Sequence, residues 1–396
     1  MRTNTLQWKR TLRIALLCLA FTSSSLISMG QLRFDSYDFS VTYPSGNTLY
    51  FHILDANNHC VSITCPGAND GYNYDTNHPK PTGELILPET VTHNGITYTV
   101  TKISTYAFHT CSGLTGSLVI PNTVTEIDEA AFSACTGFNG TLTLSDNLTT
   151  IGKNAFNTCS GFTGSLVIPN SVTKIGNSAF QYCSFNNGTL SLPEGVTYIG
   201  TNAFDRCDFT GSLIIPSTVT TLGTYAFLDC SSFDGDLILK CNNLAKGIIL
   251  AGIFKNCSGF TGDLVLPKGI LKINQDAFLN CSGFSAMYVC TNSIPNLASN
   301  EMFTGMNRNI PVYVNFDMIA NYTSGNTTGN SWHYFNNFVG CSFFLEEGNW
   351  SDDANWTSQT VPPTDRRVII AANCTVDGEY TNPNTTLLKF NDLTIA

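Results

Sequence analysis

The pattern Ala-Phe-x-x-Cys recurs down this chain at a nearly constant spacing, with small departures. Successive phenylalanines are 24, 24, 24, 24, 23, 27 and 24 residues apart. A period of this size is typical of repeat arrays, in which one unit cannot bury its apolar face alone and stacks on its neighbours. The sequence therefore predicts a solenoid whose function belongs to a surface rather than to a pocket. The repeated core positions are Phe108, Cys111, Phe132, Cys135, Phe156, Cys159, Phe180, Cys183, Phe204, Cys207, Phe227, Cys230, Phe254, Cys257, Phe278 and Cys281.

Each repeat opens with a stretch in which two apolar residues alternate with outward-facing positions. Leu118 and Ile120 alternate with Ser117, Val119 and Pro121, which is the period of a half-buried strand. Stacked repeats would align these strands in a parallel sheet, and the proline would end the ladder where the chain turns. The inward pairs recur as Leu142/Leu144, Leu166/Ile168, Leu190/Leu192, Leu213/Ile215, Leu237/Leu239 and Leu264/Leu266.

The rest of each repeat is expected to turn back toward the next strand. A second extended segment points residues such as Val172 and Ile175 inward. Glycine follows in most repeats and tolerates positive φ, so we expect it to form a corner. Ala-Phe-x-x-Cys then covers less than two helical turns, with Phe and Cys facing the interior. The corner glycines are Gly152, Gly176, Gly200 and Gly223.

One repeat departs from this pattern. Lys240 stands where proline is usual, three residues are inserted, and Gly252-Ile253 replaces the expected Tyr-Ala. We expect this coil to bulge. A degenerate ninth copy of the repeat follows at Met302-Phe303. The sequence therefore predicts about nine coils of about 24 residues over residues 83–305. The fold class is a mainly β solenoid with parallel strands and short helical turns.

The cysteines could form either disulfides or a buried column of thiols. Fifteen cysteines in an exported chain first suggest a disulfide scaffold. Eight of them occupy one equivalent position per coil, however, where parallel Cα–Cβ vectors do not converge as a disulfide requires. We therefore expect a reduced, buried column. Cys60 with Cys65, and Cys241 or Cys290, lie outside this position, and their oxidation state is open.

The first 30 residues have the order of a cleaved secretory signal. Four basic residues precede an apolar run from Ile14 to Phe21, and small polar residues follow up to Gln31. The apolar run is too short for a membrane span. Without this segment, 15 Lys and Arg oppose 29 Asp and Glu, a net charge near −14. Nucleic acid is therefore not an expected partner, because phosphate contacts require clustered basic residues.

A resemblance to a known family rests on strings such as the one at residues 164–183. It reads Gly-Ser-Leu-Val-Ile-Pro-Asn-Ser-Val-Thr-Lys-Ile-Gly-Asn-Ser-Ala-Phe-x-x-Cys. This string resembles the BspA-like leucine-rich repeats of exported Bacteroidetes proteins. The resemblance implies a leucine-rich-repeat solenoid at the bacterial outer surface, or secreted, that adheres to a protein or glycan of host matrix or of other bacteria.

The same resemblance divides the chain. Segments before and after the array look like the caps of such proteins, and Gly348-Asn349-Trp350 looks like the start of another surface module. That module ends abruptly at Ala396, so we expect a truncated chain. The predicted parts are a signal peptide (1–30), a β-rich leader or cap (31–82), the solenoid (83–305), a carboxy-terminal cap (306–343) and a second β-rich module (344–396).

Catalytic chemistry is not expected. No nucleophile elbow, phosphate-binding glycine loop or dinucleotide fingerprint occurs in a suitable setting. His59-Cys60 with Cys65 matches no common zinc spacing. The interpretation is a chain that is not an enzyme and needs no cofactor or metal.

The candidate binding face is the outward side of the first strand. A strip of β-branched residues beside hydroxyls could receive a partner, although the same residues suit any pleated surface. A column of single threonines, such as Thr125 and Thr173, is attributed to strand propensity rather than to ice binding. The first hypothesis is a binding or adhesion protein, and the alternative is a structural spacer that displays a carboxy-terminal module. The candidate face comprises Val119, Thr143, Val167, Ser191, Ile214, Ile238 and Val265.

Overall fold

The computed structural model describes the solenoid and its flanking strands. Residues 1–36, which include the predicted signal peptide, lie outside the described residues, as does most of the predicted second module. The backbone is described for residues 37–67, 74–75, 77–241, 243–291, 293–299, 301–323, 331–344, 348–349, 368–370, 374–376, 385–387 and 393–395.

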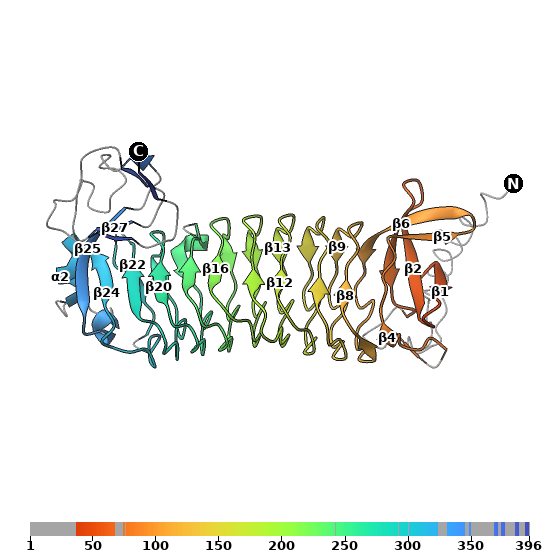
Figure 1. Cartoon of the computed structure of the whole chain (residues 1–396), viewed down its shortest axis with the longest axis horizontal. Coiled ribbons are helices and arrows are strands. Elements are labelled where there is room, and N and C mark those ends of the chain that lie inside the picture. Colours follow the sequence, from red (N-terminus) through yellow and green to blue (C-terminus); the bar gives the residue numbers. More distant parts are fainter. Residues whose placement is uncertain are drawn as a thin grey trace, which may run out of the picture. The chain divides into compact units, whose positions relative to one another are not determined.

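The first side of each coil is a short strand, and these strands stack in parallel along the array (Figure 1). Leu118 pairs with Leu142, and Ile214 pairs with Ile238, so equivalent residues of successive coils stand side by side. The predicted parallel strands and their alternation are therefore confirmed. The strands are β8 (Leu118–Val119), β10 (Leu142–Thr143), β12 (Leu166–Val167), β14 (Leu190–Ser191), β16 (Leu213–Ile215), β18 (Leu237–Leu239), β20 (Asp263–Leu266) and β22 (Ala286–Val289).

A second line of parallel strands forms the next side of the coils. The turn between the two sides is closed by the proline, since the carbonyl of Pro169 accepts the N–H of Val172 at 3.0 Å. Val172 and Ile175 are fully buried. The strands are β9 (Glu126–Ile127), β11 (Thr150–Ile151), β13 (Lys174–Ile175), β15 (Tyr198–Ile199), β17 (Thr221–Leu222), β19 (Ile248–Ile249), β21 (Lys272–Ile273) and β23 (Asn296–Leu297).

The Ala-Phe-x-x-Cys segment forms the third side as a series of tight turns, in place of the expected helical turn. Ser178, Phe180 and Tyr182 donate their N–H groups to carbonyls of the next coil at 2.8 to 2.9 Å. The residues that alternate with them donate to carbonyls three positions back in the same coil. Ser178 and Tyr182 have φ of 52° and 59°. Every second N–H group of this segment therefore bonds to the next coil, whereas a helix would use all of them within the segment. The left-handed φ of Ser178 and Tyr182 turns their N–H groups toward that coil.

The corner glycines are needed for close packing and not for positive φ, which corrects the expectation. Gly152, Gly176, Gly200 and Gly223 are absent from the positive-φ residues. A Cβ added at Gly176 would lie 2.6 Å from backbone atoms of the preceding coil. The coils approach here so closely that any side chain would separate them. Positive φ occurs instead at glycines before the first strand, such as Gly164 at 76°.

The irregular coil bulges as expected. After β18 the chain forms a short 3-10 turn, η1 (Ala245–Gly247), in which Lys246 and Gly247 both have φ of 60°. The second line of strands breaks at this point, because β17 ends one sheet and β19 begins another. The first line continues without interruption from β16 through β24.

The amino-terminal strands continue the second line of strands beyond the first coil. β1 to β3 pair antiparallel, β3 pairs parallel with β6, and β6 pairs with β9. Tyr74 and Lys80 reach from this region to the first coil, donating to the carbonyls of Ala107 (2.7 Å) and Thr110 (3.1 Å). The strands are β1 (Phe39–Thr42), β2 (Thr48–Asp55), β3 (Cys60–Thr64), β4 (Gly83–Glu84), β5 (Thr90–His93), β6 (Ile96–Ile103) and β7 (Leu114–Thr115).

At the other end, further parallel strands extend the first line. β24 pairs with β22, β25 with β24, and β27 with β25. The predicted boundary at residue 343 therefore falls inside a sheet whose next strand begins at Val368. The remaining elements are η2 (Phe316–Met318), α2 (Ile319–Thr323), η3 (Ser331–Tyr334), β24 (Val312–Asn315), β25 (Phe338–Phe344), β26 (Gly348–Asn349), β27 (Val368–Ile370), β28 (Cys374–Val376), β29 (Thr385–Leu387) and β30 (Leu393–Ile395).

Candidate binding surface

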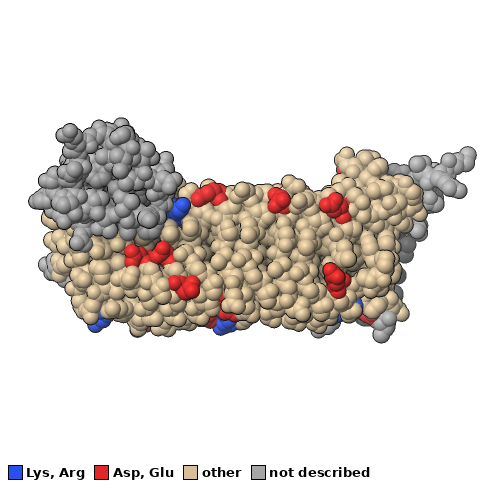
Figure 2. Space-filling model, viewed as in Figure 1, with Lys and Arg blue, Asp and Glu red and all other residues tan. Residues whose placement is uncertain are grey.

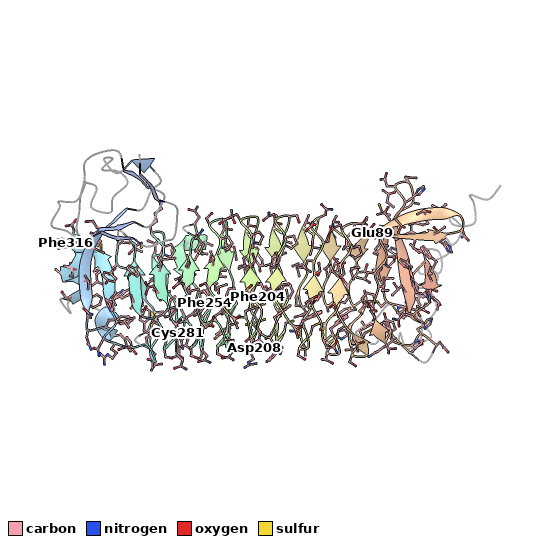
Figure 3. All side chains as sticks on the ribbon, viewed as in Figure 1. Glu89, Phe204, Asp208, Phe254, Cys281 and Phe316 are labelled. Carbon is pink, nitrogen blue, oxygen red and sulfur yellow. The ribbon has the colours of Figure 1, made fainter. Side chains whose placement is uncertain are left out.

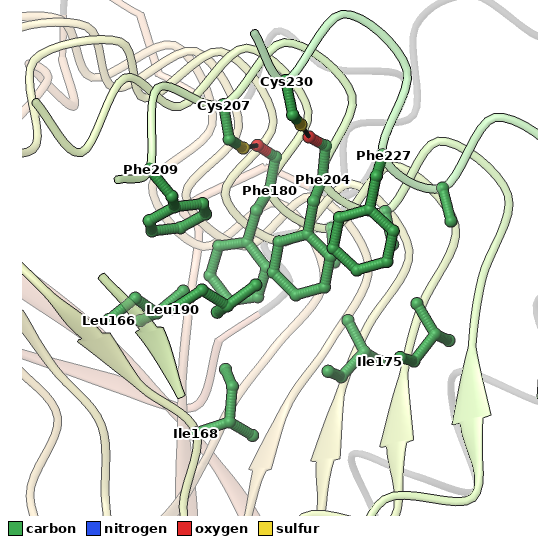
Figure 4. Packing of buried hydrophobic residues seen from close by; sticks show 14 of the residues in the cluster. Leu166, Ile168, Ile175, Phe180, Leu190, Phe204, Cys207, Phe209, Phe227 and Cys230 are labelled. Carbon is green, nitrogen blue, oxygen red and sulfur yellow. Dashed lines mark hydrogen bonds between the residues drawn. The ribbon is translucent and has the colours of Figure 1, made fainter. Parts of the chain in front are cut away.

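Two columns of phenylalanine rings support the surface from inside. The rings from Phe108 to Phe303 stack with neighbouring centroids 5.0 to 6.0 Å apart and planes within 15°. A second column runs from Phe138 to Phe284. Its Phe209 lies beside the rings of Phe180 and Phe204 of the first column (Figure 4). Offset aromatic stacking adds to the apolar area already buried. Figure 3 shows Phe204 and Phe254 in this regular interior, so each coil presents its outer face at a fixed spacing.

The repeated cysteines form a column of buried thiols, and each thiol after the first has a hydrogen-bond acceptor. The Sγ of Cys183 lies 3.0 Å from the carbonyl oxygen of Phe156 in the preceding coil. Cys207 and Cys230 donate in the same way to Phe180 and Phe204 (Figure 4). This donor role was missed from the sequence, where cysteine was interpreted only as a small apolar residue. The thiol therefore links the turn side of one coil to the next.

The thiols in this column are protonated and unreactive. Burial raises the pKa of Cys281 to about 12, and burial likewise raises the pKa of Cys183 and Cys207. The thiolate is the reactive form of cysteine, so these side chains are protected both by burial and by protonation.

The four cysteines left open by the sequence are also free thiols. Cys60 donates to the carbonyl of Asn58, and Cys65 lies 3.2 Å from the carbonyl of Gly67. Cys241 and Cys290 are both buried. A disulfide between Cys60 and Cys65 is not formed.

The outward side of the first strand carries the exposed apolar residues that the sequence predicted there. Val119, Val167 and Ile214 are 55%, 61% and 41% exposed. Thr143 and Ser191 are exposed between them, because they pair with Val119 and Val167 in the same register. Neighbouring parallel strands are about 4.8 Å apart. The result is a strip of alternating β-branched and hydroxyl side chains.

The strip ends sooner than the sequence suggested. Ile238 is half-buried, and Val265 is only 6% exposed. Val265 pairs with Tyr288 and belongs to a separate buried cluster with Ala286, Cys290 and Cys341. The prediction that Val265 belongs to an accessible face is therefore wrong, because its outward side chain is already covered.

The hydroxyl column beside the strip is used for structure. The Oγ of Ser117 accepts the N–H of Thr141 at 3.0 Å, and the Oγ of Ser165 accepts that of Thr189 at 3.0 Å. Ser212 does the same for Asp236 at 2.9 Å. These side chains join neighbouring coils where each strand begins. The hydroxyls of Ser117, Ser165 and Ser212 are consequently occupied by contacts between coils.

Sequence reasoning missed three residues on the outward side. Ile86 is 67% exposed between the buried Leu85 and Leu87. Its alternation was visible in the sequence, but it lies before the first regular repeat. Tyr288 and Tyr313 stack with centroids 4.6 Å apart at the other end. No repeat signal identifies them, because the consensus is lost after β20.

The threonine column is explained by backbone contacts. The hydroxyl of Thr149 donates to the carbonyl of Thr125 at 3.0 Å, and that of Thr197 donates to Thr173 at 3.2 Å. The same carbonyls accept the backbone N–H of these threonines. Threonine therefore adds a second bond between coils, beyond the strand propensity expected for it.

Titratable groups are few and scattered on this surface. Figure 2 shows a face that is mostly uncharged, with isolated acidic groups and few basic ones. Among the residues whose side chains the structure describes, no three His, Cys, Asp or Glu gather in a way that could hold a metal ion. No helix in the described ranges is long and apolar enough to cross a membrane.

Comparison of the sequence with protein families gives one match. Residues 96–234 and 247–327, more than half of the chain, match the model of the BspA-type leucine-rich repeat region, with six copies. The unmatched gap between them contains the insertion of the irregular coil. No curated protein matches the sequence.

Three solved bacterial structures are similar in fold. A leucine-rich cell surface protein of Faecalibacterium prausnitzii is 20% identical, covering 76% of this chain and 94% of that one, with a TM-score of 0.40. A leucine-rich repeat protein of Bacteroides ovatus is 17% identical, covering 91% and 79%, with a TM-score of 0.47. The pneumococcal vaccine antigen PcpA is 13% identical, covering 91% and 99%, with a TM-score of 0.42.

Proposed function

Because the chain belongs to the family of BspA-type leucine-rich repeat proteins, we propose that it is an exported, non-catalytic binding protein. Its role is adhesion: it holds a protein or glycan of a host or bacterial surface without altering it chemically. Membership of the family supports a general role in protein interaction. The exposed surface described above supports the more specific role in adhesion.

The exposed strip on the first strand carries this proposal. Val119, Val167 and Ile214 present apolar area to solvent, although a soluble surface would accept polar residues at these positions equally well. The strip recurs in register from coil to coil, so a partner that extends along the stack meets equivalent groups repeatedly. Several weak contacts on one rigid support combine into firm binding.

The rigidity of the support strengthens this argument. Stacked rings and thiol-to-carbonyl bonds fix each coil against the next, so few side chains lose conformational freedom when a partner binds. A preorganised surface needs less interaction energy for the same affinity. β-branched valine and isoleucine are themselves stiff about χ1.

The test is a binding measurement with the full chain against matrix proteins, plasma proteins, bacterial cell-wall glycans and whole cells. A variant with Val119, Val167 and Ile214 changed to Arg blocks the strip. The matched control changes Thr125, Thr173 and Thr220 to Arg and adds the same charge to the second line of strands.

We expect saturable binding that the strip variant loses and the control retains, with unchanged circular dichroism in both. Equal loss in the two variants would show a general charge effect and contradict the assignment to the strip. No saturable binding to any member of the panel would favour a structural spacer.

A further inference from the structure

The irregular coil gathers positive charge in a chain that is otherwise acidic. Five of the eleven lysines lie between residues 240 and 272, although the chain has a net charge of −10. Over the same stretch Asp263 is the single acidic residue. A local patch of opposite sign to the whole protein attracts partners that the rest of the surface repels. The five lysines are Lys240, Lys246, Lys255, Lys268 and Lys272.

Some lysines of the array form ion pairs across a coil boundary, in regular coils and in the irregular one alike. Lys102 contacts Glu126 at 2.9 Å, and Lys153 contacts Glu129 at 2.8 Å, each one coil away. Lys255 reaches Asp276 at 2.9 Å. Within the part of the chain that the structure describes, Lys240, Lys246 and Lys272 make no ion pair.

The backbone of the bulge brings two of these lysines together around an exposed leucine. The N–H of Leu271 donates to the carbonyl of Gly247 at 2.8 Å, directly after Lys246. Lys272 pairs with Ile248 on the neighbouring strand. Leu271 is 58% exposed at a position where regular coils carry threonine. Lys246 and Lys272 therefore lie beside an exposed leucine along the backbone of β19 and β21.

We propose that this surface, defined by Lys246, Leu271 and Lys272, docks an acidic polypeptide segment that carries an apolar side chain beside its carboxylates. The charge selects a polyanion, and the exposed leucine selects among polyanions. A sulfated polysaccharide would satisfy the lysines but bury no apolar group on Leu271. A polypeptide satisfies both, because carboxylates and apolar side chains alternate within a few residues.

The site differs from the strip on the first strand, so it adds a second contact to the proposed adhesion surface. It lies where the second line of strands breaks between β17 and β19. Leu271 replaces a threonine whose hydroxyl would otherwise bond to the neighbouring coil, as Thr220 does to Thr197 at 3.2 Å. At Leu271 the sequence has an exposed apolar group in place of this contact between coils.

The experiment uses the full chain and three probes: a synthetic peptide of glutamates with interspersed leucines, poly-L-glutamate of equal length, and dextran sulfate. Affinities are measured by titration calorimetry at low and at physiological ionic strength. The first variant changes Lys246 and Lys272 to Ser, and the second changes Leu271 to Ser. The control changes Lys153 and Lys174 to Ser, which removes equal charge from regular coils.

We expect the leucine-containing peptide to bind most tightly, and more weakly as salt screens the lysines. Loss of two ion pairs at the surface should reduce its affinity about fivefold, while the control changes it little. Leu271→Ser should bring its affinity down to that of poly-L-glutamate. Both changed surfaces are exposed or half-exposed, and a melting curve confirms folding.

Three results would overturn the proposal. Dextran sulfate binding as tightly as the leucine-containing peptide would assign the surface to polysaccharide. Equal losses in the lysine variant and the control would show that net charge alone is measured. An absence of saturable peptide binding to the unchanged chain would mean that the patch does not dock an acidic segment.

Discussion

Replacing single glycines by alanine tests whether close approach or backbone conformation explains the two glycine positions of each coil. Gly176 has ordinary φ, but a Cβ there would lie 2.6 Å from the preceding coil's backbone, about 0.8 Å inside the 3.4 Å at which ordinary contact begins. Gly164 has φ of 76°, and the nearest atom to its Cβ would be 3.5 Å away. The first substitution therefore meets backbone, whereas the second meets only an unfavourable conformation.

The expected magnitudes differ accordingly. At Gly176 the coils must separate, which costs about 1 to 3 kcal/mol for overpacking. The 2.8 Å bond from the Gly176 N–H to Ile151 and its neighbour from Asn154 to Asn177 lengthen as well, at about 1 kcal/mol each. A less flexible unfolded chain offsets about 0.4 to 1 kcal/mol. We expect Gly176→Ala to lower the free energy of unfolding by about 3 kcal/mol.

Gly164→Ala should cost about 1 kcal/mol, since a left-handed conformation costs a residue with Cβ roughly 1 to 2 kcal/mol before the same offset. Urea unfolding of the full chain, followed by far-ultraviolet circular dichroism, measures both. A shifted midpoint with unchanged slope reports stability. The reasoning is refuted if Gly164→Ala destabilises the protein as much as Gly176→Ala does.

Two further predictions concern buried ionisable groups. Asp205 is 3% exposed, Gln181 donates to its Oδ2 at 2.7 Å, and its Oδ1 has no partner among the described residues. Burial raises its pKa in the folded state, so stability falls as pH rises above the unfolded pKa. Asp205→Asn should therefore raise the urea midpoint at pH 7 and change little at pH 3; an equal gain at both values would contradict this cause. The second prediction concerns treatment of the native protein with iodoacetamide at pH 8. The reagent should label the partly exposed Cys60 and not the buried Cys159 and Cys183, because burial raises the pKa of these two thiols. Peptide mapping that finds Cys183 labelled as fast as Cys60 would show that the coils open readily.

The sequence was sufficient for the features that repeat. Spacing and alternation predicted the solenoid, its parallel strands and the burial of the repeated Phe and Cys, because each depends on one period seen many times. The bulge at Lys240 was also visible as a broken period. The periodic pattern is present in each repeat because every coil packs against neighbouring coils of the same structure.

Features that depend on contacts between coils could not be predicted from one repeat. The corner glycines were assigned to positive φ, since nothing in Gly176 itself shows that another backbone lies against it. The turn at Phe180 has helical spacing, but its N–H groups are shared with the next coil. Val265 was placed on an open face because alternation gives the side of a sheet, not what covers it.

The direction of the hydrogen bonds between coils makes the two ends of the stack chemically different. On the turn side the N–H groups that bond between coils point toward the next coil, as from Phe180 to Ala203, so the first coil is left with carbonyls that have no preceding donor. Tyr74 supplies such a donor to the carbonyl of Ala107, and Lys80 donates to the nearby carbonyl of Thr110. If an internal coil is duplicated or deleted, every bond between coils can form again. Removing the amino-terminal leader instead leaves carbonyl oxygens of the first coil without donors. A longer array can therefore arise by copying its middle, and growth at the first coil requires these two donors to move with it.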